Sequence, residues 1–234
     1  MIIGSGLLAT AFAERPAPAS NCWIYAAGVS NSGCADRQEF AREHARLSKA
    51  LRAGARADAF VYFSTCSVLD PNIVNSAYIR HKLEMEQLVA EHPNWIVVRL
   101  PQLAGRTPNP HTLLNYLHAR IARSESFVIW RKATRNIIDV ADAAAIVMEV
   151  LADPRARRMT VNVANPIGHS IAEIIEVMEQ VTGKAAITEQ LDTGAAYDID
   201  TSQIGPTISR LGLAFDRSYL ARVIRKYYGK MDRK

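Results

Sequence analysis

A tyrosine and a lysine four positions apart are the residues in this chain with the clearest chemistry. Tyr78 and Lys82 share one face of any helix that contains them. An ammonium group beside a phenol lowers the pKa of the phenol from about 10 toward neutrality, where the phenol can exchange a proton with a bound substrate. Tyrosine and lysine often occur at this spacing by chance, so the pair indicates a catalytic site only if other segments agree with it.

A cluster of hydroxyl groups precedes the tyrosine. Ser64, Thr65 and Ser67 follow a run of β-branched and aromatic residues, which places them at the end of an expected strand. One of these hydroxyls could hydrogen-bond a substrate oxygen beside the phenol. Hydroxyl groups at a strand end equally serve as caps of a turn or helix.

Two segments of small residues could accommodate a ligand backbone. The first has the form G-x-G-x-x-A and consists of Gly4, Ser5, Gly6, Leu7, Leu8 and Ala9. Glycines between a strand and a helix let the backbone turn tightly and approach a pyrophosphate, although a simple strand–helix turn has the same form. The second segment ends another expected strand and consists of Ala26, Ala27 and Gly28.

The composition is that of a globular protein. With 234 residues, 49% hydrophobic and 22% charged, the chain is neither disordered nor a disulfide-rich scaffold. The net charge of +5 permits anionic ligands, but the dispersed basic residues do not predict a nucleic-acid surface. Neither the three cysteines nor the six histidines have the spacing of metal ligands, so we expect reduced thiols and no metal.

The residue pattern also gives an expectation for where in the cell the protein is located. No stretch reaches the about 20 continuous apolar residues that cross a bilayer. The apolar N-terminal segment lacks the basic residues that open a secretory signal, because its first charge is Glu14. We therefore expect a cytoplasmic protein.

Helix and strand patterns alternate along the chain, which predicts an α/β fold with a parallel sheet covered by helices. The expected strands are 1–3, 22–27, 59–64, 95–100, 137–140 and 160–163. The expected helices are 7–14, 36–53, 76–91, 111–123, 141–152 and 170–182. From residue 185 onward we expect a further strand and two short helical segments.

The order of these features resembles the extended short-chain dehydrogenase/reductase family, in particular its NAD-dependent nucleotide-sugar epimerase/dehydratase group. Glycine turn, small strand end, hydroxyl cluster and Tyr-x-x-x-Lys follow one another at the carboxyl ends of successive strands. Four further segments resemble elements of that family: 61–68 (VYFSTCSV), 97–105 (VVRLPQLAG), 135–142 (RNIIDVAD) and 161–164 (VNVA).

The resemblance implies roles for individual residues. Tyr78 would exchange a proton with a sugar hydroxyl or keto oxygen, and Lys82 would tune it while contacting the nicotinamide ribose. Thr65 would hydrogen-bond the same oxygen, with Ser67 as the alternative residue for this role. The cofactor, NAD or NADP, would contact Gly4, Ser5, Gly6, Leu7, Leu8, Ala26, Ala27, Gly28, Tyr78, Lys82, Leu100 and Pro101. The nucleotide-sugar substrate would contact Ser67, Gln102 and Arg135.

The chain departs from the family at one point. Only residues 15–21 separate the first helix from a strand that resembles the fourth strand of the family. Two strands and a helix are therefore expected to be missing, together with the usual adenosine pocket. The adenine end of a cofactor would then be exposed, or held by other groups such as Arg15 or Arg37.

Two functional hypotheses remain at this stage. In the first, the chain is a compact NAD(P)-dependent reductase or epimerase of nucleotide sugars, as in surface-polysaccharide synthesis, and forms a homodimer through helices 36–53 and 76–91. In the second, it is a non-catalytic relative that serves as a binding or regulatory module for a nucleotide or nucleotide sugar. Either way we expect a Rossmann-like core over 1–165, with 106–134 contributing to a substrate lobe that is completed by 166–234.

Overall fold

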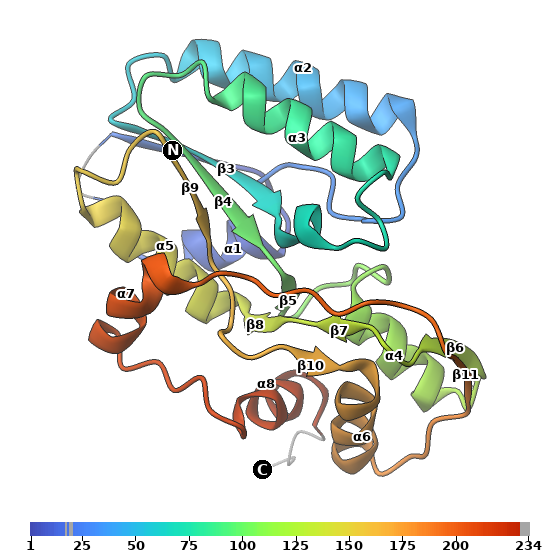
Figure 1. Ribbon diagram of the computed structural model, residues 1–234. Coiled ribbons are helices and arrows are strands. Elements are labelled where there is room, and N and C mark those ends of the chain that lie inside the picture. The colour runs from blue at the N-terminus through green and yellow to red at the C-terminus, as the bar shows by residue number, and fades with distance from the viewer. Residues whose placement is uncertain (17, 19–20, 230–234) are drawn as a thin grey trace.

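The computed structural model describes residues 1–16, 18 and 21–229, and it contains a central five-stranded parallel sheet (Figure 1). Its strands run in the order β1 (Ile2–Ile3), β2 (Cys22–Tyr25), β3 (Ala59–Thr65), β4 (Trp95–Leu100) and β9 (Met159–Asn162). Each neighbouring pair is parallel. Because parallel strands share one direction, their carboxyl ends meet at the same edge of the sheet.

Helices cover both faces of this sheet (Figure 1). One face carries α1 (Leu7–Ala13) and α5 (Val140–Ala152), and the other carries α2 (Arg37–Ala53) and α3 (Ala77–Val89). Side chains of β3 alternate between the two cores: Val61 packs toward α1 and α5, and Tyr62 packs toward α2 and α3. This arrangement confirms the expected α/β fold with helices on both faces.

The sheet is short on the side of β1. Helix α1 ends at Ala13 and β2 begins at Cys22, so the connection has no room for a strand, a helix and a second strand. In the described part of the chain β1 pairs with β2 alone, through Ile2 opposite Ile24. The reduced number of strands agrees with the expectation.

A second hydrophobic core lies below the sheet, in the lower part of Figure 1. It is built from α4 (Leu113–Ala122), β6 (Phe127–Trp130), α6 (Ile171–Thr182) and α8 (Tyr219–Tyr228). Small strands border it: β5 (Gln102–Ala104) with β8 (Ile137–Asp139), β7 (Thr134–Arg135) with β10 (His169–Ser170), and β6 with β11 (Thr188–Leu191). Most of these strands were not expected from the sequence, because two to four residues carry no alternating pattern.

One segment of the expected substrate lobe packs on the sheet domain instead. The 3₁₀ turn Ser202–Ile204 and helix α7 (Gly205–Arg210) lie against β9 and α5, and Ile204 is buried in the core shared with α1. The division of the chain at residue 165 therefore remains a prediction. No helix in the described ranges has the length and apolar character that crossing a bilayer requires.

Candidate active site

The carboxyl ends of the central strands surround a cavity of about 300 Å³. This is the edge of a parallel α/β sheet at which ligands bind. The predicted site residues that line the cavity are Gly6, Leu7, Leu8, Ala26, Gly28, Thr65, Ser67, Tyr78, Lys82, Leu100, Pro101 and Gln102. The structure thus brings together segments from the glycine turn, three strand ends and one helix.

Three predicted cofactor residues do not line this cavity: Gly4, Ser5 and Ala27. Gly4 has a φ of +135°, and a Cβ atom there would lie 2.3 Å from the carbonyl oxygen of Ala26. Glycine is therefore needed at this position so that the turn can pack against the end of β2. The cofactor contacts of all three residues stay predictions.

Tyr78 enters the cavity from the first turn of α3, which begins after the cap formed by Ser76 Oγ and the backbone N–H of Ile79. Its phenol is hydrogen-bonded to the hydroxyl of Thr65 at the end of β3. Burial raises the pKa of the Tyr78 phenol to about 12; the Thr65 hydrogen bond lowers it, and the charge of Glu43 raises it further. The phenol is accordingly protonated at neutral pH.

The two candidate hydroxyls of the cluster have different partners. Thr65 contacts the catalytic candidate Tyr78, and its Oγ1 also accepts a hydrogen bond of 3.0 Å from the backbone N–H of Ser67. The Ser67 side chain instead hydrogen-bonds Tyr197, which comes from the C-terminal segment. The geometry therefore favours Thr65 for the oxygen beside the phenol and Ser67 for a more distant part of a ligand.

Lys82 does not lower the pKa of Tyr78 as the sequence predicted. Its Nζ atom lies 3.0 Å from Tyr62 Oη, 3.2 Å from Glu43 Oε1 and 3.4 Å from the Phe63 carbonyl oxygen. The ammonium charge is paired with a carboxylate, and Glu43 acts on the phenol with the opposite sign. Burial consequently dominates the pKa of Tyr78.

Glu43 is a site residue that the sequence analysis missed. The residue is 3% exposed, and its carboxylate accepts hydrogen bonds from Lys82, Tyr62 Oη at 2.8 Å, the backbone N–H of Val29 at 2.6 Å and His81 Nε2 at 3.0 Å. Burial alone favours the neutral acid, but the His81 hydrogen bond, the Lys82 charge and the other donors together lower the pKa of Glu43 to about 2.

The signal for Glu43 was present in the sequence of α2. Glu43, Leu47 and Ala50 recur at intervals of four and three residues, and all three are buried on one face of the helix. A carboxylate within an apolar stripe is rarely buried without a partner. That pattern would have pointed to an interior cation.

Two features of the cavity wall suit a polar ligand. Ser64 Oγ is buried and has no hydrogen-bond partner among the residues that the structure describes, and Ser64 lines the cavity. At Gly28 a Cβ atom would lie 2.7 Å from Lys82 Nζ, so the missing side chain keeps the backbone close to the ammonium group. The cavity therefore offers an unpaired hydroxyl and a close backbone approach near the buried lysine.

The wall also contains residues that the sequence analysis did not single out. They are Val29, Ser30, Phe63, Leu103, Thr107, Asn109, His111 and Thr112. The side chain of Asn109 donates a hydrogen bond of 3.4 Å to Ser30 Oγ, which joins the loop after β5 to the loop after β2. These loops carry no regular pattern, so only the folded chain reveals their role.

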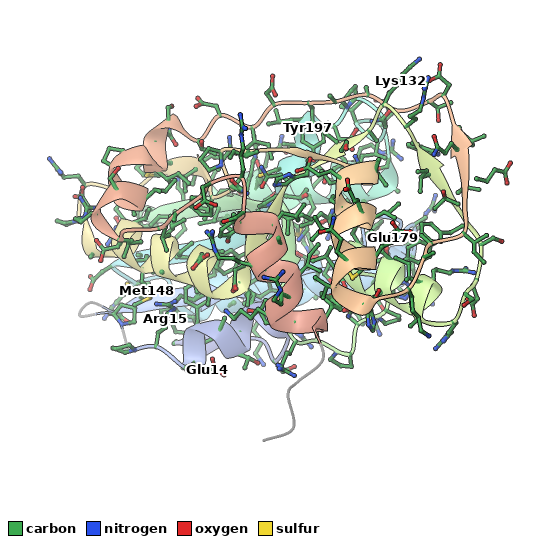
Figure 2. The ribbon with its side chains drawn as sticks, turned by 90° about the horizontal axis from the view of Figure 1, so that it is seen from below. Glu14, Arg15, Lys132, Met148, Glu179 and Tyr197 are labelled. Atoms are coloured by element: carbon green, nitrogen blue, oxygen red, sulfur yellow. The ribbon has the colours of Figure 1, made fainter. Side chains whose placement is uncertain are left out.

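Arg135 lies outside the main cavity. It lines a separate hollow of about 320 Å³ with Tyr197 and Asp198, and its guanidinium is 3.5 Å from the buried carboxylate of Asp70. Figure 2 shows Tyr197 on the opposite side of the view from Glu14. The predicted contact of Arg135 with a substrate diphosphate remains a prediction.

Arg15, a candidate for the adenine end of a cofactor, is engaged elsewhere. Its guanidinium donates a hydrogen bond of 2.5 Å to the carbonyl oxygen of Ala141 at the start of α5. Figure 2 shows Arg15 beside Glu14, on the side of the molecule that carries α1. Arg15 does not line the main cavity.

A parallel sheet with a glycine turn after β1 and a buried Tyr–Lys–Thr group at its carboxyl edge defines an α/β protein of the dinucleotide-binding type. Residues 19–164 match the model of the NAD dependent epimerase/dehydratase family, and the chain belongs to this family. No curated protein matches the chain in a sequence search.

Solved structures share the fold at low sequence identity. UDP-glucuronic acid 4-epimerase from Bacillus cereus, in complex with UDP-glucuronic acid and NAD, has a TM-score of 0.72 and 18% identity, over 87% of this chain and 73% of that chain. UDP-glucose 4-epimerase from Thermus thermophilus, in complex with NAD, has a TM-score of 0.68 and 14% identity, over 88% of this chain and 76% of that chain. RMD from Pseudomonas aeruginosa, complexed with NADPH, has a TM-score of 0.67 and 15% identity, over 88% of this chain and 79% of that chain.

Proposed function

We propose that the protein is an NAD(P)-dependent enzyme that reduces, epimerises or dehydrates a nucleotide-activated sugar. The observation that carries this proposal is that Thr65, Tyr78 and Lys82 line one cavity at the carboxyl edge of the sheet. Family membership supports the use of a nicotinamide cofactor, and the structures similar to this chain include complexes with NAD or NADPH.

The residues present fit a nicotinamide ribose. Ser64 offers a buried hydroxyl that has no hydrogen-bond partner among the described residues, and the close approach of the Gly28 backbone holds the wall of the cavity against the ammonium group of Lys82. The longest of the three Lys82 contacts is the one to the Phe63 carbonyl, at 3.4 Å. A ribose hydroxyl that takes the place of this carbonyl would receive a charged hydrogen bond without breaking the pair with Glu43.

The nicotinamide, when bound, supplies hydride exchange, and the protein supplies placement and protons. Tyr78 is protonated at neutral pH because burial raises its pKa, so the phenol is poised to donate a proton to a substrate oxygen. The hydroxyl of Thr65 contacts the phenol and can hydrogen-bond the same oxygen. The buried position of both groups keeps water from competing for that oxygen.

A nucleotide sugar is the substrate class that we infer. Gln102 and Ser67 line the cavity beyond the tyrosine, and the hollow with Arg135 and Tyr197 is linked to it through the Ser67–Tyr197 hydrogen bond. A forked guanidinium suits a diphosphate. Synthesis of a surface polysaccharide, a homodimer packed through α2 and α3, and a cytoplasmic location complete the proposal.

A second candidate function is a binding or regulatory module without turnover. Two observations favour it: the Lys82 ammonium is buried and paired with the Glu43 carboxylate, and the pKa of Tyr78 is raised rather than lowered toward neutrality. Such a module would bind a nucleotide or nucleotide sugar in the cavity but would not oxidise or reduce it.

Replacement of Tyr78 by phenylalanine tests the enzymatic proposal. We expect Tyr78→Phe to lose about 10²-fold or more of the turnover of a nucleotide sugar, because the proton donor is removed, while the fold is kept. The measurement follows product formation and nicotinamide absorbance with a panel of nucleotide sugars and both cofactors. Full activity of Tyr78→Phe would refute the mechanism.

A further inference from the structure

Lys82 has an unusual environment for a lysine. Its side chain is 3% exposed, and its ammonium group lies between α2, α3 and β3. Removing an ammonium group from water favours the neutral amine unless a counter-charge compensates. The other two groups that contact Nζ are the Tyr62 hydroxyl and the Phe63 carbonyl, which carry no charge.

Glu43 supplies that counter-charge from a neighbouring helix. Its carboxylate is held by three groups besides Lys82: the Tyr62 hydroxyl, His81 Nε2 and the backbone N–H of Val29. These donors come from β3, α3 and the loop after β2, so the carboxylate is fixed from three directions. A carboxylate that is fixed in this way fixes the ammonium group that it binds.

We propose that Glu43 is the positioning residue for Lys82: it holds the ammonium group at the cavity wall and keeps it charged when a ligand covers the cavity. The expected consequence, tighter binding of the nicotinamide ribose, rests on the proposed function. The geometry of the Glu43–Lys82 pair stands independently of that function.

The other titratable groups around the pair do not replace Glu43. Tyr25 on β2, Tyr62 on β3 and Tyr78 on α3 are phenols whose pKa values burial raises, so they are neutral at pH 7. Glu86 on α3 also acts on Lys82, but its carboxylate accepts hydrogen bonds from Nε and Nη2 of Arg99, at 2.9 and 2.7 Å.

The imidazole of His81 completes this environment. It lies on the far side of Glu43 from Lys82, stacked on Phe40 with ring centroids 4.4 Å apart. The two groups bind different oxygens of the carboxylate, His81 at Oε2 and Lys82 at Oε1, so both can hold it at once.

The experiment is an NMR pH titration of lysine side-chain signals, with the Lys82 signal assigned by its loss in Lys82→Met. In the wild-type protein we expect Lys82 to stay charged well above neutral pH. In Glu43→Gln, which keeps the shape but not the charge, we expect the Lys82 midpoint to fall by about 2 pH units. An unchanged midpoint would overturn the proposal.

Asp139→Asn is the matched control for this variant. Asp139 is buried and accepts hydrogen bonds from Lys226 Nζ at 2.7 Å and Tyr227 Oη at 2.8 Å, so it also binds one lysine and one tyrosine. It does not line the cavity. We expect Asp139→Asn to leave the Lys82 midpoint where it is; an equal fall in both variants would contradict a specific role for Glu43.

Titration with NADH separates positioning from stability. In Glu43→Asp the carboxylate is kept but withdrawn by one methylene group, so we expect Lys82 to remain charged at pH 8 while the Kd for NADH rises about 10-fold. Wild-type affinity in Glu43→Asp would overturn the positioning role, and this variant also decides the question if Glu43→Gln does not fold. If the wild-type protein does not bind NADH, the proposed function fails, while the NMR midpoint still decides whether Glu43 holds the Lys82 charge.

Discussion

The backbone of Gly28 approaches the side chain of Lys82 so closely that a Cβ atom would lie 2.7 Å from the Nζ atom. The same Cβ atom would lie 2.8 Å from Glu43 Oε1. The end of β2 thus closes directly on the buried ion pair that joins α2 to α3. A glycine is required here because of this close approach.

Replacement of Gly28 by alanine should therefore disturb the ion pair. The added methyl group must displace the Lys82 ammonium or the Glu43 carboxylate, which costs about 1–3 kcal/mol of unfolding free energy and weakens cofactor binding. Urea unfolding and NADH titration measure both effects. Gly205→Ala is the control: its Cβ would meet nothing within 4 Å, and its backbone is helical, so stability should be unchanged or slightly raised. Normal stability and normal NADH affinity in Gly28→Ala would argue against a tightly fixed pair.

The hydroxyl of Thr65 should matter more to turnover than that of Ser67. Thr65→Val removes the hydrogen bond to Tyr78, and we expect a loss of about 10-fold or more in kcat, while Thr65→Ser keeps most of the activity. Ser67→Ala should act mainly on the KM of the sugar substrate, because Ser67 contacts Tyr197 rather than the phenol. Steady-state measurements of kcat and KM for the three variants show which hydroxyl acts on turnover and which on substrate binding. A larger kcat effect in Ser67→Ala than in Thr65→Val would exchange the two roles.

Stability should depend on pH through Glu43. Its pKa is about 2 in the folded protein against an ordinary value of 4.5, so the unfolded chain takes up a proton first as the pH falls. The stabilisation is therefore complete above pH 4.5 and is lost as the pH falls toward 2, by an amount on the order of 3 kcal/mol.

Urea unfolding of the wild-type protein and of Glu43→Gln at several pH values below 5 measures this contribution. The variant has no carboxylate to titrate at this position, so its free energy of unfolding should vary less with pH than that of the wild type. Equal slopes in the two proteins would mean that Glu43 is not the group responsible.

The local spacing of residues accounts for what the sequence predicted well. Tyr78 and Lys82 are within one helix, and Thr65 ends a strand whose direction in a parallel sheet fixes where its carboxyl end lies. The short connection between α1 and β2 is likewise visible in the chain, so the reduced sheet could be expected. These features need no knowledge of contacts between distant segments.

Long-range contacts account for what the sequence could not predict. The apolar stripe of α2 marks Glu43 as buried, but Glu43 lies 39 residues before Lys82, and nothing in their spacing shows that α2 and α3 bring the two together. The expected fall in the pKa of Tyr78 was wrong for the same reason, because the charge of Lys82 is taken up by a partner outside its own helix. Arg135 likewise pairs with a residue far from it in the sequence, Asp70, and lines a separate hollow, neither of which its own segment indicates.

Titration of the protein with NADH and NADPH by calorimetry tests the central claim most directly. We predict that at least one of them binds with a Kd below about 1 mM, and that Lys82→Met weakens this binding at least 10-fold. Lys226→Met, which removes the partner of Asp139 outside the cavity, should bind like the wild type. Absence of binding by either cofactor at millimolar concentration would contradict the enzymatic assignment and leave the non-catalytic alternative.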